Sequence, residues 1–226
     1  MLICIYDKET KVALSFLATI GISIVLAGIL YLFSRNPSNG FHPREGLVCA
    51  SACWILISLV GCLPFFISRQ IPSFIDALFE IVSGFTTTGA SILSDVESLS
   101  RGLLYWRSFS HWLGGMGVLV LLMVFVPKSD HNSGSTMHLL RAESPGPNDG
   151  KLVPRMKKTA LVLYGIYMAM TILNFLFLFI GGMPLFDSVC TTFGTAGTGG
   201  FGIKSDSMAS YSPYLQNVTT IFMLLF

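Results

Sequence analysis

Charged side chains are scarce in this sequence. Asp, Glu, Lys and Arg together make up 12% of the 226 residues, whereas soluble domains carry roughly 25%. Hydrophobic residues make up 52%, the mean hydropathy is +0.68, and the apolar residues are clustered in long runs. The scarcity of charge therefore excludes an ordinary soluble domain, and the long runs predict an all-α polytopic membrane protein.

Several functional signatures are also missing. No basic patch with interleaved aromatic residues is present, so the sequence gives no sign of a nucleic-acid partner. No paired nucleophile and base, and no His-Glu-x-x-His set, lies in the apolar runs, which argues against a membrane enzyme such as an intramembrane protease. The five cysteines lack metal-ligand spacing, and we interpret them as small buried apolar side chains with no cofactor role. They are Cys4, Cys49, Cys53, Cys62 and Cys190.

Four apolar runs are long enough to cross a bilayer, because a helix of about 20 residues spans its hydrocarbon core. The first run is also too long for a typical signal-peptide core. A further apolar run begins at Tyr214 and continues for 13 residues to Phe226. The four predicted spans are 14–33, 47–67, 103–126 and 159–182.

Two shorter apolar segments, 74–84 and 184–194, cover only part of that thickness and predict helices that enter the membrane and turn back. Each is followed by a polar, glycine-rich loop, 86–91 (the first loop) and 195–201 (the second loop). Bare backbone at membrane depth is tolerated only inside protein or along a water-filled cavity. The two loops therefore point to an ion pore.

The chain repeats this plan. Asp76 precedes Gly89 by 13 residues, and Asp187 precedes Gly200 by the same 13 residues. A repeat of about 110 residues is too long for a solenoid unit. It fits a duplicated membrane module, in which ion sites lie at the interface between repeats.

The chemistry of the loops favours a monovalent cation. A short helix that ends at mid-membrane directs the negative end of its dipole at the loop, while glycine carbonyls and threonine hydroxyls can replace a cation's water shell. No carboxylate lies inside either loop. For Asp76, Glu80 and Asp187 on the short helices two interpretations stay open: complementing the helix start or facing the outer vestibule, and direct ion binding.

Lysine and arginine predict the orientation in the membrane. Eight of the 14 lie in 34–46 and 127–158, which places the segment 128–158 in the cytoplasm by the positive-inside rule. Both short helices then enter from outside. The expected organisation is a leading membrane helix in 1–34, a first pore repeat in 44–127, a cytoplasmic loop in 128–158 and a second pore repeat in 159–226.

Residues of one membrane segment, 103–126, invite further interpretation. We expect His111 at the membrane interface, four residues after Arg107. Arg107 can extend toward water or meet a carboxylate such as Glu80. Three glycines on the same segment, Gly114, Gly115 and Gly117, are expected to permit close helix packing.

Several motifs agree with one known family. They are Phe74-Ile75-Asp76-Ala77-Leu78-Phe79-Glu80 leading to Ser83-Gly84-Phe85-Thr86-Thr87-Thr88-Gly89-Ala90, Arg44-Glu45-Gly46, Trp106-Arg107-Ser108, Trp112-Leu113-Gly114-Gly115-Met116-Gly117, Gly181-Gly182-Met183 and Thr198-Gly199-Gly200-Phe201. Through these motifs the chain resembles the TrkH/KtrB potassium-uptake superfamily, in its TrkH branch, over roughly residues 13–226.

The resemblance implies repeats of helix, pore helix, filter loop and helix around one potassium path, in a multi-pass protein of a bacterial plasma membrane. It implies a homodimer in membrane lipid with a cytoplasmic nucleotide-binding regulatory subunit of the TrkA type, and transport of K⁺, in some members with Na⁺. The potassium-binding residues that it implies are Thr87, Thr88, Gly89, Thr198, Gly199 and Gly200. The residues flanking them are Thr86, Ala90, Gly197 and Phe201.

The match to the family is incomplete. The resemblance implies four filter loops for each pore, whereas this chain has two, and it implies a further helix before Leu14. We expect an N-terminal fragment or truncated gene; the alternative is that two such halves assemble into one pore. In function, the alternatives to potassium uptake are a non-conducting fragment and a potassium/sodium transporter of the same superfamily.

Overall fold

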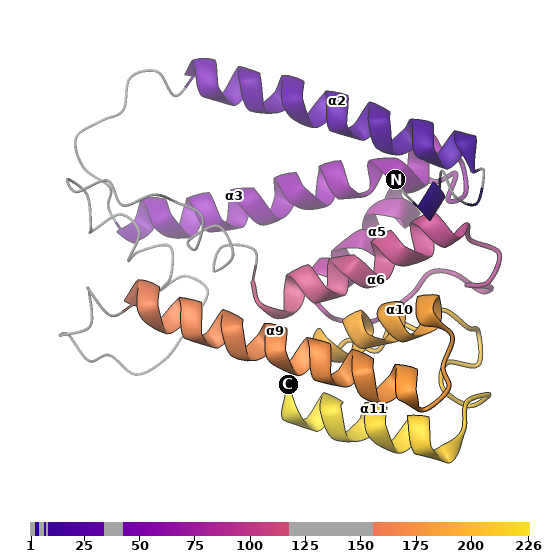
Figure 1. Cartoon of the computed structure of the whole chain (residues 1–226). Helices are drawn as coiled ribbons and strands as arrows, with labels where there is room; N and C mark the ends of the chain where they lie inside the picture. The colour runs from indigo at the N-terminus through magenta and orange to yellow at the C-terminus, as the bar shows by residue number, and fades with distance from the viewer. Residues whose placement is uncertain (1–2, 5–6, 8, 34–42, 118–155) are drawn as a thin grey trace.

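The computed structural model describes residues 3–4, 7, 9–33, 43–117 and 156–226. Within these ranges all regular secondary structure is helical, as Figure 1 shows, so the prediction of an all-α protein is confirmed. The helices are α2 (Thr10–Phe33), α3 (Pro43–Gly61), α4 (Leu63–Ile67), α5 (Phe74–Phe85), α6 (Arg101–Gly115), α9 (Met156–Ile180), α10 (Leu185–Ala196) and α11 (Pro213–Leu225).

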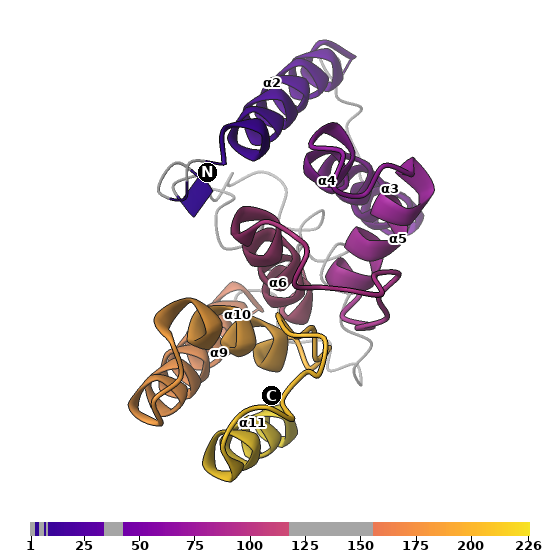
Figure 2. The same ribbon diagram turned by 90° about the vertical axis from the view of Figure 1, so that its right-hand side faces the viewer.

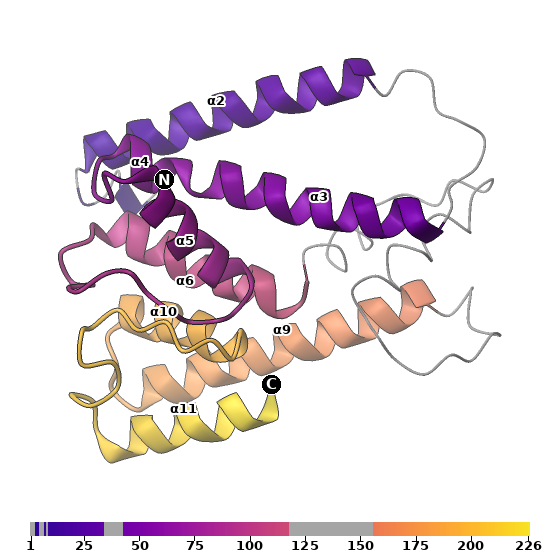
Figure 3. The same ribbon diagram turned by 180° about the vertical axis from the view of Figure 1, so that it is seen from behind.

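Three helical stretches are long and apolar enough to cross a membrane: Thr10–Phe33, Val48–Ile67 and Leu161–Ile180. They correspond to three of the four predicted spans. Helix α2 lies beside α3, whereas α9 lies on the other side of α6 (Figures 1 and 3). The second is built from α3 and α4, which meet at Cys62. Most side chains of α2 are exposed and apolar, as expected for a helix that faces lipid.

The fourth predicted span, 103–126, is wrong as a single helix. Helix α6 ends at Gly115, and Gly117 follows with a φ of 68°, a left-handed conformation that stops an α-helix. The rest of that span from residue 118 and the predicted loop 128–158 up to residue 155 lie outside the described residues. At its far end the loop is shorter than predicted, because α9 begins at Met156.

The two short helices lie among the long ones. Helices α5 and α10 have 12 residues each, start at the same end of the molecule and end near its middle (Figures 1 and 3). The Ser73 hydroxyl caps α5 by accepting a hydrogen bond from the backbone N–H of Asp76 at 3.4 Å. Both short helices predicted from the sequence are thus present, with α10 running two residues further than expected.

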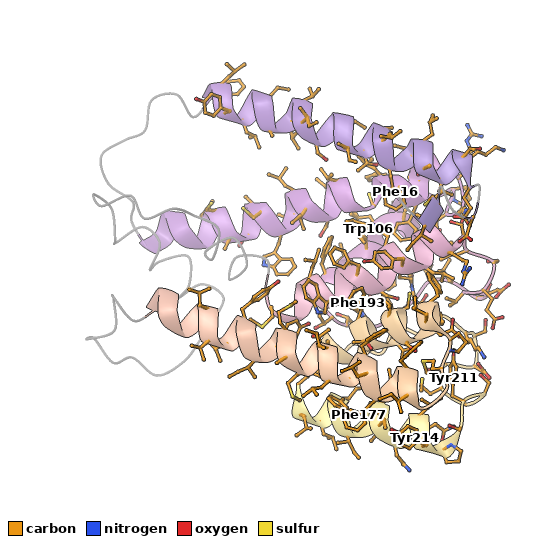
Figure 4. All side chains as sticks on the ribbon, in the orientation of Figure 1. Phe16, Trp106, Phe177, Phe193, Tyr211 and Tyr214 are labelled. Carbon is orange, nitrogen blue, oxygen red and sulfur yellow. The ribbon has the colours of Figure 1, made fainter. Side chains whose placement is uncertain are left out.

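Helix α6 occupies the centre of the bundle, between α5 and α10 (Figure 2). Aromatic side chains fill both of its sides. Trp106 meets Phe16 of α2 edge-on, with ring centroids 6.0 Å apart (Figure 4). On the other side, Phe193 of α10 packs against Phe109 and Trp112, with centroids 5.6 and 5.7 Å apart. Trp106 also meets Phe85 of α5, with centroids 6.5 Å apart. This packing fixes α6 against both short helices and hence against the loops that follow them.

Candidate functional site

The two glycine-rich loops have the same backbone conformation. In the first loop φ is 55° at Thr87 and 75° at Gly89; in the second it is 53° at Thr198 and 77° at Gly200. Each pair of equivalent residues is 111 positions apart in the sequence. A left-handed threonine is uncommon, because its β-carbon crowds the backbone. The recurrence of this pattern shows that the repeat seen in the sequence is also a repeat of loop geometry.

The ends of the two short helices are closed in the same way. The N–H of Thr86 donates to the carbonyl of Val82 at 2.8 Å, and the N–H of Gly197, 111 positions later, donates to the carbonyl of Phe193 at 3.1 Å. These bonds satisfy carbonyls that a helix end otherwise leaves unpaired. Each loop is therefore anchored directly to the negative end of its helix dipole.

The second loop is shorter than the predicted 195–201. Thr195 and Ala196 belong to the last turn of α10 and are buried, and the Thr195 hydroxyl donates to the carbonyl of Thr191 at 2.8 Å. The irregular segment therefore begins at Gly197. A threonine next to glycines looks like loop in a sequence, but here its hydroxyl bonds back within the helix.

The two loops touch through their glycines. A β-carbon placed on Gly89 would overlap the carbonyl oxygen of Gly199. The chain thus brings together two residues that the resemblance implies as ion ligands, and the carbonyl oxygen of Gly199 points at the backbone of Gly89. A side chain on Gly89 would separate the loops, whereas one on Gly199 would meet the ring of His111.

The threonine hydroxyls of the first loop form a short chain of hydrogen bonds. The Thr86 hydroxyl donates to the Val82 carbonyl at 2.8 Å and lies 2.8 Å from the Thr88 hydroxyl. Because a hydroxyl has one proton, Thr88 must be the donor to Thr86, and its oxygen keeps a lone pair for another partner. The second loop has Gly199 at the position equivalent to Thr88, so this hydroxyl occurs in one loop only.

Glu80 lies beyond the first turn of α5, and its carboxylate is occupied by protein hydrogen-bond donors. Its side chain is fully buried. The carboxylate accepts hydrogen bonds from the Ser91 hydroxyl and the Ile92 N–H, both at 2.9 Å, and from Nε of Arg107 at 2.5 Å. Of the two partners considered for Arg107, water and a carboxylate, the structure shows the carboxylate. This pair holds the exit of the first loop against α6.

The aromatic ring of Phe201 lies between two basic side chains. The Arg107 guanidinium carbon lies 3.5 Å from the ring centroid, and the His111 ring is stacked on Phe201 with centroids 3.9 Å apart. His111 is fully buried, so its ring faces the second loop and neither lipid nor water. The interface prediction rested on two basic residues sharing a helix face, and that face is covered by the second loop.

Glycines of α6 allow the loops to approach the helix. A β-carbon on Gly114 would overlap the carbonyl of Phe85, and one on Gly115 would lie 2.9 Å from the α-carbon of Gly197. The expectation of close packing is confirmed for these two residues. Gly117 differs, because it forms the left-handed turn after the helix.

The other two acidic residues of the short helices lie at helix starts. Asp76 and Asp187 occupy the first turns of α5 and α10, where they complement the helix dipoles. Asp187 also accepts a hydrogen bond from the Tyr211 hydroxyl at 2.8 Å, which ties α10 to the connection before α11. Among the described residues, no group of three or more His, Cys, Asp or Glu side chains could hold a metal ion.

Comparison with known proteins gives a consistent result. Residues 13–225 match the model of the TrkH family, described as a cation transport protein. The Trk system potassium uptake protein TrkH of Salmonella typhimurium is 36% identical over 214 residues, which cover 93% of this chain and 44% of that protein. The Trk system potassium uptake protein TrkG of Escherichia coli is 35% identical over 228 residues, 100% of this chain and 46% of that protein.

A solved structure agrees with these relatives. The crystal structure of the potassium transporter TrkH from Vibrio parahaemolyticus superposes with a TM-score of 0.75 at 28% identity, covering 95% of this chain and 42% of that chain. The chain thus spans less than half the length of the relatives it matches. It is a multi-pass protein of the plasma membrane, and it belongs to the TrkH family of cation transport proteins.

Proposed function

We propose that this chain takes part in the uptake of potassium ions across the plasma membrane and that its two loops form part of the wall of the ion path. The observation that carries the proposal is the contact of the Gly199 carbonyl with Gly89, because it joins two loops of like conformation at the ends of two short helices. The names of the relatives, potassium uptake proteins, support the choice of ion.

In this proposal neutral oxygens coordinate the cation. Backbone carbonyls and threonine hydroxyls replace the water shell of K⁺, and the negative ends of the α5 and α10 dipoles favour the positive charge. The described carboxylates near the loops support this choice of ligands, since Glu80 is paired with Arg107 and Asp187 with Tyr211. The proposed ligands are Thr87, Thr88, Gly89, Thr198, Gly199 and Gly200, flanked by Thr86, Ala90, Gly197 and Phe201.

Other partners complete the proposal. Since the relatives are more than twice as long as this chain, we propose that further loops, from outside this sequence, close the ion path. We also propose a homodimer and a cytoplasmic nucleotide-binding subunit of the TrkA type, with the chain itself acting as a transporter and not as an enzyme. The alternatives are a non-conducting fragment and a potassium/sodium transporter of the same superfamily.

Growth of a strain without its own potassium uptake tests the proposal. Expressed together with the segments that supply the further loops, this chain should restore growth and rubidium uptake at low K⁺, and Gly89→Asp or Gly200→Asp should abolish both. Gly182→Asp is the matched control, because Gly182 also has a positive φ of 87° but lies in the turn before α10, with open space around it. Normal uptake in both loop variants would contradict the proposal.

A further inference from the structure

We propose that Arg107 is a positioning residue that ties the two loops to each other, so that the shape of the second loop depends on a carboxylate of the first repeat. The inference rests on the proposed function, which gives the loops their role, and adds a determinant of ion selectivity outside them. The residues that form this cross-repeat link are Glu80, Arg107, Phe201 and Gly202.

The guanidinium of Arg107 reaches both repeats at once. Its Nε donates to Glu80 of α5 at 2.5 Å, and its Nη1 donates to the carbonyl of Gly202, just after the second loop, at 2.8 Å. Arg107 is 3% exposed and Glu80 is fully buried. A planar guanidinium with several donors in fixed directions can hold two such acceptors in a defined geometry, which an ammonium group cannot.

Glu80 extends the link to the exit of the first loop. One carboxylate oxygen accepts from Arg107, and the other accepts from the N–H of Ile92, immediately after the first loop. A continuous series of hydrogen bonds thus runs from Ile92 through Glu80 and Arg107 to Gly202. The two loops leave the site through backbone segments that are held by opposite ends of one buried ion pair.

The stacking of Phe201 restrains the second loop further. The guanidinium carbon of Arg107 and the ring centroid of His111 lie 3.5 and 3.9 Å from the Phe201 centroid. Two groups this close to one centroid cannot share a face, so they occupy opposite faces of the ring. Phe201 directly follows Gly200, and a ring held on both faces fixes where the chain leaves that glycine.

The link is asymmetric. The residues 111 positions after Glu80 and Arg107 are Thr191 and Val218, which cannot form an ion pair. The second repeat therefore has no copy of this device, and its loop depends on a residue of the first. If Arg107 no longer holds Gly202 and Phe201, we expect the second loop to lose its fixed geometry while α5 and α6 remain packed.

Arg107→Lys tests the link in the whole chain reconstituted in lipid nanodiscs. Lysine keeps the charge beside Glu80, and so preserves the fold, but cannot bond Gly202 and stack on Phe201 together. Amide hydrogen exchange in 198–204 should become about tenfold faster, the effect of losing a hydrogen bond from a charged donor. Phe201→Leu should accelerate exchange to a similar extent. It is the test variant to use if Arg107→Lys does not fold.

Arg101→Lys is the matched control on the same helix. Its guanidinium also contacts a carboxylate and a ring, Asp7 at 3.6 Å and Phe186 at 4.6 Å, but neither loop. Exchange in 198–204 should be unchanged in this variant. Unchanged exchange in both Arg107→Lys and Phe201→Leu would overturn the proposal.

A flux measurement separates this inference from the function on which it rests. In cells that take up K⁺ through the wild-type protein, Arg107→Lys should shift the K⁺/Na⁺ uptake ratio toward one, and a wild-type ratio in this variant would overturn the selectivity role. If the wild-type protein supports no uptake, the proposed function fails, while the exchange experiment still decides whether Arg107 ties the loops.

Discussion

The carbonyl oxygen of Gly199 lies so close to the α-carbon of Gly89 that a β-carbon on Gly89 would overlap it. Gly200 has nearly the same φ, 77° against 75°, but the nearest atom to a β-carbon there is Cε of Met223 at 3.9 Å. Both equivalent glycines have a left-handed backbone conformation, which favours glycine. Only Gly89 is also in close contact with the other loop. Substituting each glycine in turn can therefore separate the effect of backbone conformation from the effect of the contact between the loops.

Gly89→Ala is expected to be more damaging than Gly200→Ala. A left-handed alanine costs about 1–2 kcal/mol at either position, and overpacking against Gly199 adds about 1–3 kcal/mol at Gly89 alone. Rubidium uptake should therefore fall further in Gly89→Ala than in Gly200→Ala. Gly182→Ala, which has a φ of 87° and open surroundings, should lose some stability and retain uptake. Equal uptake in the two loop variants would show that the contact between the loops is unimportant.

Glu80→Gln should lower the free energy of unfolding by about 3–5 kcal/mol, because it leaves the buried charge of Arg107 without its partner. Denaturant unfolding of the detergent-solubilised chain measures the loss. The control is Glu97→Gln, whose exposed carboxylate accepts one hydrogen bond from the Ser205 N–H at 3.1 Å and should cost about 1 kcal/mol. A loss as small as that of the control would mean that the ion pair does not contribute to stability.

Gly115→Ala should destabilise the chain by about 1–3 kcal/mol, because the new methyl group would lie 2.7 Å from the Tyr167 hydroxyl and 2.9 Å from the Gly197 α-carbon. Gly165→Ala on α9 has open space around it and should gain about 0.5–1 kcal/mol from helix propensity. Thermal unfolding of both variants in the same detergent checks the difference in sign. If both variants shift in the same direction, close packing of α6 on the second loop is refuted.

The stability of the chain should fall above about pH 10, partly through Tyr211. Burial raises the pKa of Tyr211, and the hydrogen bond to Asp187 with the charges of Asp187 and Asp206 raises it further. The unfolded tyrosine ionises near pH 10, so this stabilisation is complete below pH 10 and is lost as the pH rises toward the folded pKa.

Tyr211→Phe isolates that contribution, since phenylalanine keeps the ring and removes the ionising hydroxyl. Melting temperatures measured from pH 8 to pH 11 should decline less steeply in the variant than in the wild type. Parallel curves would show that Tyr211 does not contribute to the alkaline loss.

Run length predicted the short helices well, because a short, largely apolar segment with an acidic residue in its first turn leaves few alternatives. The 13-residue steps to Gly89 and Gly200 also predicted the repeat of loop geometry. The end of α6 could not be found in this way, since residues beyond Gly115 are as apolar as those before it. A hydrophobic run shows that residues avoid water and does not show where a helix stops.

The contacts of His111, Glu80 and Phe201 were harder to predict. The contacts of Phe201 with Arg107 and His111 depend on which helix face the other repeat covers, and tertiary packing between residues about 90 positions apart decides that. Glu80 depends instead on packing within the first repeat, against Arg107 27 positions away. One signal was available: an arginine and a glutamate in apolar segments are expected to pair, since an isolated charge is costly in a membrane. A carboxylate such as Glu80 is one of the two possible partners that the sequence predicts for Arg107. No sequence pattern predicted the contact of Arg107 with the second loop.

The most direct test of the proposed ion path is anomalous diffraction from crystals of the chain grown with thallium(I) in place of potassium. A peak should lie between the two loops, coordinated by oxygens from the first loop, 87–89, and from the second, 198–200. Thallium bound elsewhere in the chain, with none at the loops, would contradict the assignment of these residues as the cation site.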